Sequence, residues 1–254
     1  MPELWFGVTA KSAYQGPEDS FLNADEESWA KSLLENYEPI KKEFYDYLAV
    51  NGMVPYFHQS IINKKDIWKT LGLKFWNIVV HKHQASFPLT YQWLKQNPEV
   101  IAFSYSKLEP FGRILPHSGD TNGVYRVHVG IDIPEGLPRC GFRVNDVKRP
   151  WQEKKLLTFI DAYEHEAWNE TEKSRIIMLI DVIRPEFRKK QSYICKKVIA
   201  SLILYKLVAV FPVFNHKPEA IPLWLKKVLM FGILMAVYLA IPARNIVAKL
   251  RPIK

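Results

Sequence analysis

Apolar positions in the first 98 residues recur with the period of an α-helix. The spacing of about 3.6 residues is clearest at Trp29, Leu33, Tyr37, Ile40 and Phe44. Asn23 and Glu26 have the spacing of a capping box at the start of this helical pattern. A second helix is predicted over Phe87–Gln96, because Asn97-Pro98 stops a helix. We expect residues 1–98 to form a helical buttress that belongs to the same domain as the chemistry but does not carry it.

From Val100 the pattern changes to short runs that are rich in β-branched residues. The predicted strands are Val100–Leu108, Val124–Asp132, Cys140–Val144, Leu156–Ile160 and Ile176–Ile183. Turn signals such as Pro134-Glu135-Gly136 and Asn145-Asp146 separate these strands. Several short strands at this spacing predict a β-sandwich or jelly-roll barrel over residues 99–191, and the mouth of such a barrel can hold a metal and a small ligand. The fold class is therefore mainly β with flanking helices.

Two strongly apolar stretches, Ile194–Phe214 and Leu223–Ile241, predict a helical hairpin in the C-terminal residues 192–254. The uncharged part of the second stretch, Val228–Ala243, is shorter than the roughly 20 residues that span a bilayer. The preceding Lys226-Lys227 could add to it by snorkelling. We therefore expect an interfacial or re-entrant hairpin at a membrane. The alternative is a pair of helices that packs on the soluble body.

The net charge of +9 is spread unevenly. Residues 188–254 contain 13 lysines and arginines and one acid, whereas residues 1–187 contain 22 basic and 25 acidic residues. The basic residues of the tail lie among aliphatic side chains rather than among stacking aromatic ones. This pattern favours anionic membrane lipid as a partner and argues against nucleic acid.

Two cysteines, Cys140 and Cys195, form neither a metal-ligand spacing nor a disulfide framework. This usage is typical of a reducing compartment. The first residues lack the charged start and apolar centre of a signal peptide. We therefore expect a membrane-associated protein whose catalytic part faces the cytoplasm.

The run Val124–Asp132 places unusual residues on one face of a predicted strand. Alternate side chains of a strand point to opposite faces, so Arg126 and His128 share one face, while Val127 and Val129 lie on an ordinary core face. A guanidinium beside an imidazole is costly to bury unless the face meets water or an anion. The alternative is a strand face exposed to solvent.

Two histidines and an arginine stand near the ends of predicted strands. His117 follows Pro116, His165 follows the strand Leu156–Ile160, and Arg175 opens a run too apolar to be exposed. Neutral imidazoles are good ligands for a redox metal, and arginine is the preferred partner of a dicarboxylate. A single histidine in such a place is more often a hydrogen-bonded structural residue, so the hypothesis depends on the convergence of all three.

The stretch from Ser106 to Pro185 resembles the aspartyl/asparaginyl β-hydroxylase family of Fe(II)/2-oxoglutarate dioxygenases. The matching pieces are Pro116-His117-Ser118-Gly119, Thr121-Asn122-Gly123, Arg126-Val127-His128-Val129-Gly130, Glu164-His165-Glu166-Ala167-Trp168-Asn169, Arg175, Asp181-Val182 and Arg184-Pro185. The resemblance covers about 80 of the 254 residues. It implies a double-stranded β-helix, also called a jelly roll.

The resemblance also implies the roles of the site residues. Iron would be held by His117 and His165, and a carboxylate of 2-oxoglutarate by Arg175. Ser106, Arg126 and His128 would contribute nearby as cofactor-binding residues, and O2 would be the second co-substrate. Glu164, Glu166 and Asp161 are candidates for groups that orient the imidazoles.

The sequence departs from the common histidine-x-carboxylate…histidine triad of such enzymes. Gly119 stands where the carboxylate would be, so no side chain at that position can bind iron. The resembled family shares this two-histidine site, and water could fill the vacant ligand position. Asp120 is adjacent and could bind that water or the metal, although a role as a turn residue is the simpler interpretation.

The resemblance implies hydroxylation of an unactivated C–H bond. The family acts on the β-carbon of protein Asp or Asn, and similar proteins hydroxylate acyl chains of membrane lipids. Because the tail is basic and apolar, we expect a membrane-proximal substrate, with a lipid-linked acyl chain ahead of a peptidyl Asp or Asn. The alternative from another class is a non-catalytic jelly-roll binding module.

Overall fold

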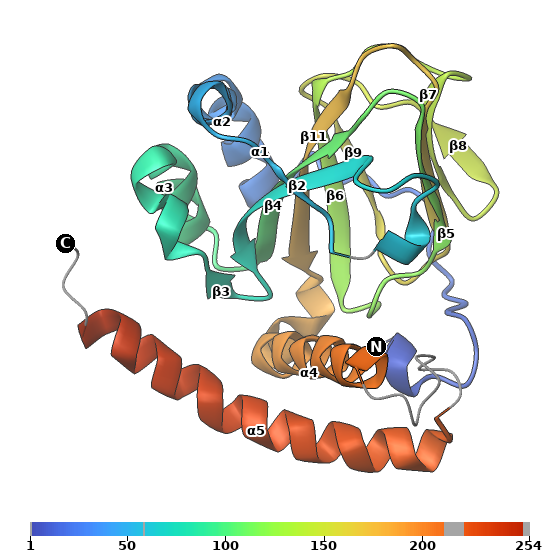
Figure 1. Cartoon of the computed structure of the whole chain (residues 1–254), viewed down its shortest axis with the longest axis vertical. Coiled ribbons are helices and arrows are strands. Elements are labelled where there is room, and N and C mark those ends of the chain that lie inside the picture. Colours follow the sequence, from blue (N-terminus) through green and yellow to red (C-terminus); the bar gives the residue numbers. More distant parts are fainter. Residues whose placement is uncertain (1, 58, 211–220, 251–254) are drawn as a thin grey trace.

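Eight strands form a jelly-roll barrel of two antiparallel sheets (Figure 1). The computed structural model describes residues 2–57, 59–210 and 221–250. One sheet contains, in spatial order, β4 (Val100–Leu108), β11 (Arg175–Ile183), β6 (Val124–Asp132) and β9 (Leu156–Ile160). The other contains β5 (Gly112–His117), β10 (His165–Asn169), β7 (Cys140–Val144) and β8 (Val147–Arg149). Successive strands cross from one sheet to the other except at the β7–β8 hairpin, which confirms the predicted jelly-roll class.

The larger sheet is extended by strands that the hydrophobic pattern does not predict. β2 (Trp68–Phe75) pairs with β4, and β1 (Val54–Pro55) and β3 (Ile78–Val79) pair with β2. All three lie in the region expected to be helical. The polar Lys74 conceals the strand pattern, yet it is buried and its Nζ donates a hydrogen bond to the carbonyl of Val100 at 2.5 Å. Cross-sheet contacts therefore decide the structure of this segment.

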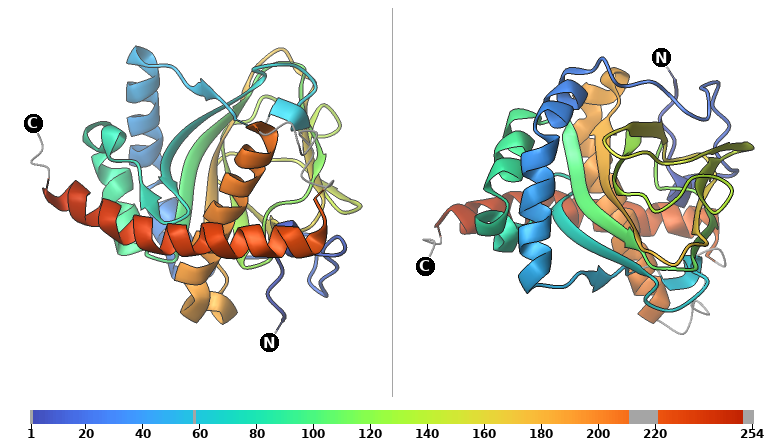
Figure 2. Two further views of the ribbon diagram at one scale, coloured as in Figure 1. Left: turned by 60° about the horizontal axis from the view of Figure 1, so that its bottom comes forward. Right: turned by 90° about the horizontal axis from the view of Figure 1, so that it is seen from above.

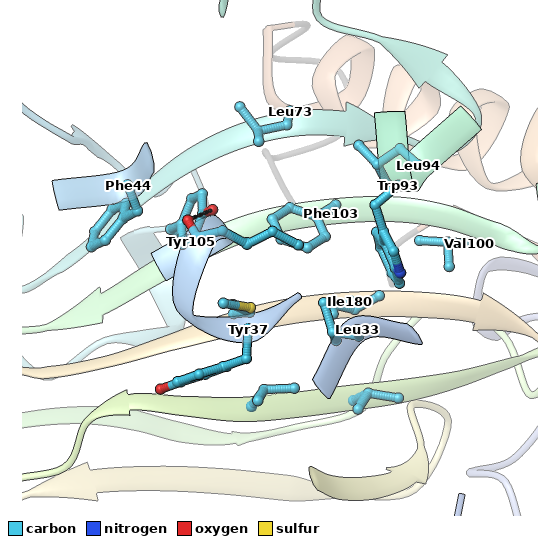
Figure 3. Close-up of a cluster of buried hydrophobic side chains, with 14 of the residues drawn as sticks. Leu33, Tyr37, Phe44, Leu73, Trp93, Leu94, Val100, Phe103, Tyr105 and Ile180 are labelled. Atoms are coloured by element: carbon cyan, nitrogen blue, oxygen red, sulfur yellow. Dashed lines mark hydrogen bonds between the residues drawn. The ribbon is translucent and has the colours of Figure 1, made fainter. Parts of the chain in front are cut away.

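Three helices cover the outer face of the larger sheet (Figure 1). They are α1 (Ser28–Glu35), α2 (Tyr37–Val50) and α3 (Pro88–Gln96), with the short 3₁₀ turns η2 (Gln59–Ile61) and η3 (His81–Ser86) between them. Their apolar side chains and those of the sheet form one core, of which Figure 3 shows Leu33, Tyr37, Phe44, Leu73, Trp93, Leu94, Val100, Phe103, Tyr105 and Ile180. The apolar face predicted for β6 belongs to this core, so its other face is directed between the two sheets.

The predicted capping box does not form. The Oδ1 of Asn23 accepts a hydrogen bond from the backbone N–H of Asp25, and α1 begins only at Ser28. Asn23 therefore makes a local turn before the helix.

A buried carboxylate on α2 holds the start of α3. Glu43 accepts hydrogen bonds from the backbone N–H groups of Leu89 and Thr90 and from the Thr90 hydroxyl. These amides open a helix and have no acceptor within it. We expect Glu43→Ala to lower the free energy of unfolding by about 2 kcal/mol, as measured by urea denaturation. Glu38→Ala, on the exposed side of α2, should change it by less than about 0.5 kcal/mol; equal effects would contradict this role for Glu43.

The C-terminal helices pack beneath the barrel (Figure 2). The turn η4 (Pro185–Lys190) leads from β11 into α4 (Gln191–Val210), and α5 (Leu223–Leu250) packs against α4. The core between them also includes Phe6 and Val8, from the N-terminal turn η1 (Gly7–Thr9) and the residue before it. The segment between the two helices lies largely outside the described residues.

One helix in the described part of the chain is long and apolar enough to cross a membrane. Its 18-residue segment Leu223–Ala240 has a mean hydropathy of 1.8 and is 11% buried within the protein. Most of this segment is therefore accessible from outside.

Candidate functional site

His117 and His165 lie side by side between the two sheets. His117 ends β5 and His165 begins β10, where the two residues are direct partners in the antiparallel register. Their ring centroids are 4.2 Å apart. Each Nδ1 lies 2.8 Å from the backbone carbonyl two residues earlier, of Leu115 and Tyr163 respectively. A proton on Nδ1 satisfies that carbonyl and leaves the lone pair on Nε2, the arrangement that a metal ligand requires.

Burial keeps His165 in its neutral form. Desolvation lowers the pKa of His165 well below its usual value, and the neighbouring His117 lowers it further. A neutral imidazole is the form that binds a metal. The arrangement of the pair therefore suits coordination rather than an ion pair.

Asp161 fills the space next to Gly119. The carbonyl of Asp161 accepts a hydrogen bond from the Gly119 N–H at 2.7 Å. A Cβ at position 119 would lie 1.8 Å from the Asp161 Oδ2. The Oδ1 of the same carboxylate is 3.8 Å from the Nε2 of His165. Because Gly119 has no side chain, the carboxylate of Asp161, which directly follows β9, can approach the histidine pair.

Arg126 joins two buried carboxylates. Its Nε and Nη2 donate to the two oxygens of Asp181 at 2.7 and 2.9 Å, and its Nη1 lies 2.5 Å from Asp161. Arg126 and Asp181 are direct partners on β6 and β11, so the pairing follows from the strand register. Desolvation lowers the pKa of Arg126, but the two carboxylates outweigh it and raise the pKa above its usual value. This guanidinium is fixed by the protein, and its predicted contact with a co-substrate stays a prediction.

Arg175 differs from Arg126 because no carboxylate pairs with it in the described part of the chain. It is only 1% exposed, and its Nε and Nη1 are buried without a hydrogen-bond partner. The guanidinium lies over the ring of Trp151, 4.5 Å from its centroid. Desolvation lowers the pKa of Arg175 to about 10. A buried cation without an anion is costly, so this position fits a bound anion.

His128 and Ser106 complete the polar lining near Arg175. The Nδ1 of His128 accepts a hydrogen bond from the Trp151 indole, which leaves its proton on Nε2. The Ser106 hydroxyl accepts from the Trp68 indole at 2.9 Å, and its own proton is available to another acceptor. Burial lowers the pKa of His128 well below its usual value, and Arg175 lowers it further.

All six residues predicted from the sequence line one small cavity. Its lining comes from both sheets and comprises Trp68, Ser106, Ile114, His117, Arg126, His128, Phe142, His165, Ala167, Arg175, Ile177 and Leu179. The histidine pair belongs to the smaller sheet, whereas Ser106, Arg126, His128 and Arg175 belong to the larger one. The cavity is therefore the space between the sheets at which the strand ends converge.

The side chains present fit a metal held by two histidines, together with a small molecule whose carboxylate Arg175 binds. Two adjacent imidazoles offer Nε2 lone pairs, and the same cavity contains the unpaired donors of Arg175. Across the described residues there is no cluster of three or more His, Cys, Asp and Glu side chains in metal-binding geometry. Protein ligands would thus number two, with coordination positions left for co-substrate and water.

The residues that hold this arrangement together are not marked in the sequence. Asp161 is only one of three candidates for orienting an imidazole, and no sequence signal distinguishes Trp68 and Trp151. The other two candidates, Glu164 and Glu166, pair with Arg143 at 3.0 and 2.5 Å instead. Asp120 accepts a hydrogen bond at its backbone carbonyl from Gly7. Burial raises the pKa of the Asp120 side chain to about 6.

Gly119→Ala should displace Asp161 and weaken metal binding at the histidine pair. The added methyl group would overlap the Asp161 carboxylate, so the carboxylate or the loop must move. We expect a 10–100-fold loss of affinity for Fe(II), about the effect of removing a supporting group at a metal site, measured by anaerobic titration. Gly136→Ala is the matched control, because its Cβ would meet its nearest neighbour at 3.9 Å. Unchanged affinity in Gly119→Ala would show that the position of Asp161 is unimportant.

A family model for aspartyl/asparaginyl β-hydroxylase matches residues 34–185. The chain is therefore a member of the aspartyl/asparaginyl β-hydroxylase family. This confirms the resemblance carried by the motifs between Ser106 and Pro185.

The relatives differ in what they act on. The chain is 32% identical over 162 residues to an ornithine lipid ester-linked acyl 2-hydroxylase of Rhizobium tropici, covering 62% of this chain and 58% of that protein. It is 36% identical over 110 residues to human aspartyl/asparaginyl β-hydroxylase, covering 41% of this chain and 14% of that protein. The chain thus spans less than two thirds of the length of either relative.

Solved structures resemble the chain more loosely. A prolyl-4-hydroxylase of Pseudomonas putida overlays with a TM-score of 0.39 at 11% identity, covering 61% of this chain and 87% of that one. A cupin domain of a transcriptional regulator from Enterobacter cloacae overlays with a TM-score of 0.33 at 11% identity, covering 46% and 98%. The assignment of the jelly roll rests on the strand order of this chain.

Proposed function

We propose that this chain is an Fe(II)- and 2-oxoglutarate-dependent dioxygenase that hydroxylates an unactivated C–H bond. The observation that carries the proposal is the placement of two metal-competent imidazoles and one unpaired buried guanidinium around the same cavity. The family supports an oxygenase. The resemblance implies the iron and the 2-oxo acid, and the donor set of the cavity fits both.

Each residue has a distinct task in this proposal. His117 and His165 would hold the iron through Nε2, and Arg175 would bind the distal carboxylate of 2-oxoglutarate as a bidentate partner. Ser106 and His128 would donate further hydrogen bonds to the co-substrate. Iron with 2-oxoglutarate and O2 supplies the oxidising power, with succinate and CO2 as by-products. Asp161 would accept a hydrogen bond from water near the histidines, and Arg126 holds Asp161 in place.

The substrate that we propose is a lipid-linked acyl chain, ahead of a peptidyl Asp or Asn. Support comes from the similarity to the Rhizobium tropici lipid acyl hydroxylase and from the accessible apolar segment of α5. Both also support association with an anionic membrane. A catalytic part on the cytoplasmic side stays a prediction.

The direct test uses the full chain with Fe(II), 2-oxoglutarate and O2. One reaction contains a bacterial lipid extract and a parallel one contains Asp- and Asn-containing peptides. We expect iron-dependent succinate and a gain of one oxygen in the lipid acyl chains by mass spectrometry. Oxygen gained only by peptides would overturn the lipid preference. Absence of succinate in both reactions would favour the binding module instead.

A further inference from the structure

The outer face of α5 carries a continuous apolar surface. Trp224, Phe231 and Leu239 are 67%, 70% and 75% exposed. With their neighbours they define the α5 outer stripe, which consists of Trp224, Val228, Phe231, Met235, Tyr238 and Leu239. The spacing of three, four and seven residues places all six on one side of the helix. Such a contiguous exposed apolar surface is typical of an interaction site.

The opposite side of α5 is occupied by the protein itself. Met230 and Val237 are 4% and 5% exposed and belong to the core shared with α4. Figures 1 and 2 show α5 running across one side of the molecule, where it crosses α4 and continues beyond it toward its C-terminal end. A helix held along one side by the body is oriented to lie on a surface.

The charge around the α5 outer stripe fits an anionic bilayer. Neither α4 nor α5 contains an aspartate or glutamate. Lys227 is exposed beside the stripe, and the Nζ of Lys196 lies 3.8 Å from the centroid of the Tyr238 ring. Trp and Tyr residues prefer the boundary between headgroups and acyl chains, and lysines at that boundary meet lipid phosphates.

We propose that α5 lies in the plane of an anionic bilayer, with its outer stripe in the boundary between headgroups and acyl chains. The helix does not cross the membrane, because its inner side stays packed on α4. Because α4 and α5 contain lysines but no aspartate or glutamate, the occupant of the stripe is an anionic lipid surface rather than a second copy of this chain or another protein.

Docking in this way brings the proposed active site close to lipid. The turn η1 packs against α5, and the N–H of Gly7 in η1 donates to the carbonyl of Asp120 at 3.0 Å. Asp120 follows His117 by three residues. The turn η1 therefore lies between α5 and the loop that follows the first histidine. This docking rests on the proposed function, because it is the proposed substrate that is bound to the membrane.

The first test measures binding to vesicles, with no iron, 2-oxoglutarate or O2. Full-length protein is sedimented with vesicles of phosphatidylcholine alone or of phosphatidylcholine with phosphatidylglycerol. We expect binding to the anionic vesicles and at least a tenfold weaker partition for a triple variant with Trp224→Ser, Phe231→Ser and Leu239→Ser. The matched control replaces three exposed apolar residues elsewhere, with Val50→Ser, Phe75→Ser and Leu89→Ser, and should bind like the wild type.

The second test separates a helix in the plane from one that crosses. Nitroxide labels are attached to single cysteines introduced at positions 228, 231, 235 and 239, and their depth in the bilayer is measured by EPR. If α5 lies in the plane of the bilayer, all four labels should have the same shallow depth. In a crossing helix, the first and last labels would differ by about 16 Å along the helix axis, and such a gradient would overturn the proposal.

The remaining outcomes are also decisive. Equal binding of the triple variant and the wild type would overturn the inference, as would lipid-free self-association that the triple variant abolishes. Because binding is measured without turnover, failure here leaves the oxygenase proposal intact. Conversely, vesicle binding by an inactive protein would support docking and contradict only the proposed reaction.

Discussion

His165→Ala is expected to abolish iron binding and turnover while the barrel remains folded. The change removes one of two imidazoles whose ring centroids lie 4.2 Å apart, and a single histidine is a poor site for a divalent metal. Loss of a supporting group typically costs 10–100-fold in metal affinity, so loss of a ligand should cost more than about 100-fold. Anaerobic titration with Fe(II) measures the affinity, and succinate formation measures turnover.

The matched control is His83→Ala. His83 is also a buried histidine, but it lies in η3 against the ring of Tyr47, away from the cavity. It should lose comparable stability and keep iron binding. If His165→Ala retained full iron affinity, or if His83→Ala lost it equally, the histidine pair would not be the metal site.

Strands that are buried on both sides could be predicted from the sequence. The bounds of β4, β6, β7 and β9 coincide with the predicted runs. Because both faces of these strands are covered, most positions are apolar or small, and turn residues mark their ends clearly. The predicted alternation along β6 is also confirmed, since Val127 and Val129 belong to the outer core whereas Arg126 and His128 line the cavity.

Three strands of the smaller sheet, β5, β8 and β10, escaped prediction because contacts distant in sequence stabilise them. β10 reads His-Glu-Ala-Trp-Asn, which has little β-propensity. Its Glu166 is opposite Arg143 on β7 and pairs with it at 2.5 Å. β5 contains Pro116 and exposed positions, and β8 has only three residues, all exposed. No local pattern marks such strands.

The proximity of three candidate residues agrees with the sequence pattern, which places them near strand ends. The structure brings His117, His165 and Arg175 to one cavity, and their roles stay predictions. The place of Asp161 could not be predicted, since it depends on contact with Gly119, 42 positions earlier. The difference between Arg126 and Arg175 was equally hidden, because only the strand register shows which guanidinium faces a carboxylate.

Arg175→Met is expected to leave the protein without ligands at least as stable as the wild type. It should also raise the concentration of 2-oxoglutarate that turnover requires. The side chain is buried, and no carboxylate in the described residues pairs with it. Replacing it with an apolar chain of similar length removes a desolvated charge. We therefore expect the protein without ligands to unfold at the same or a higher temperature.

The same change should raise the KM for 2-oxoglutarate by roughly 100-fold, because a bidentate charge-assisted pair contributes about 2–3 kcal/mol. It should also abolish the rise in melting temperature that 2-oxoglutarate gives the wild type with a non-oxidisable metal bound. Thermal shift assays measure the stability, and succinate formation at varied 2-oxoglutarate measures the KM.

Arg184→Met is the matched control for Arg175→Met. Arg184 is a second buried arginine, but its Nη2 pairs with Glu18 at 2.6 Å and Glu186 at 2.5 Å. Its loss leaves two carboxylates without their partner, so Arg184→Met should lower the melting temperature and leave the KM for 2-oxoglutarate unchanged. If Arg175→Met instead destabilised the protein as much and left the KM unchanged, Arg175 would be a structural cation. The charge in the cavity would then not be the recognition group for a 2-oxo acid.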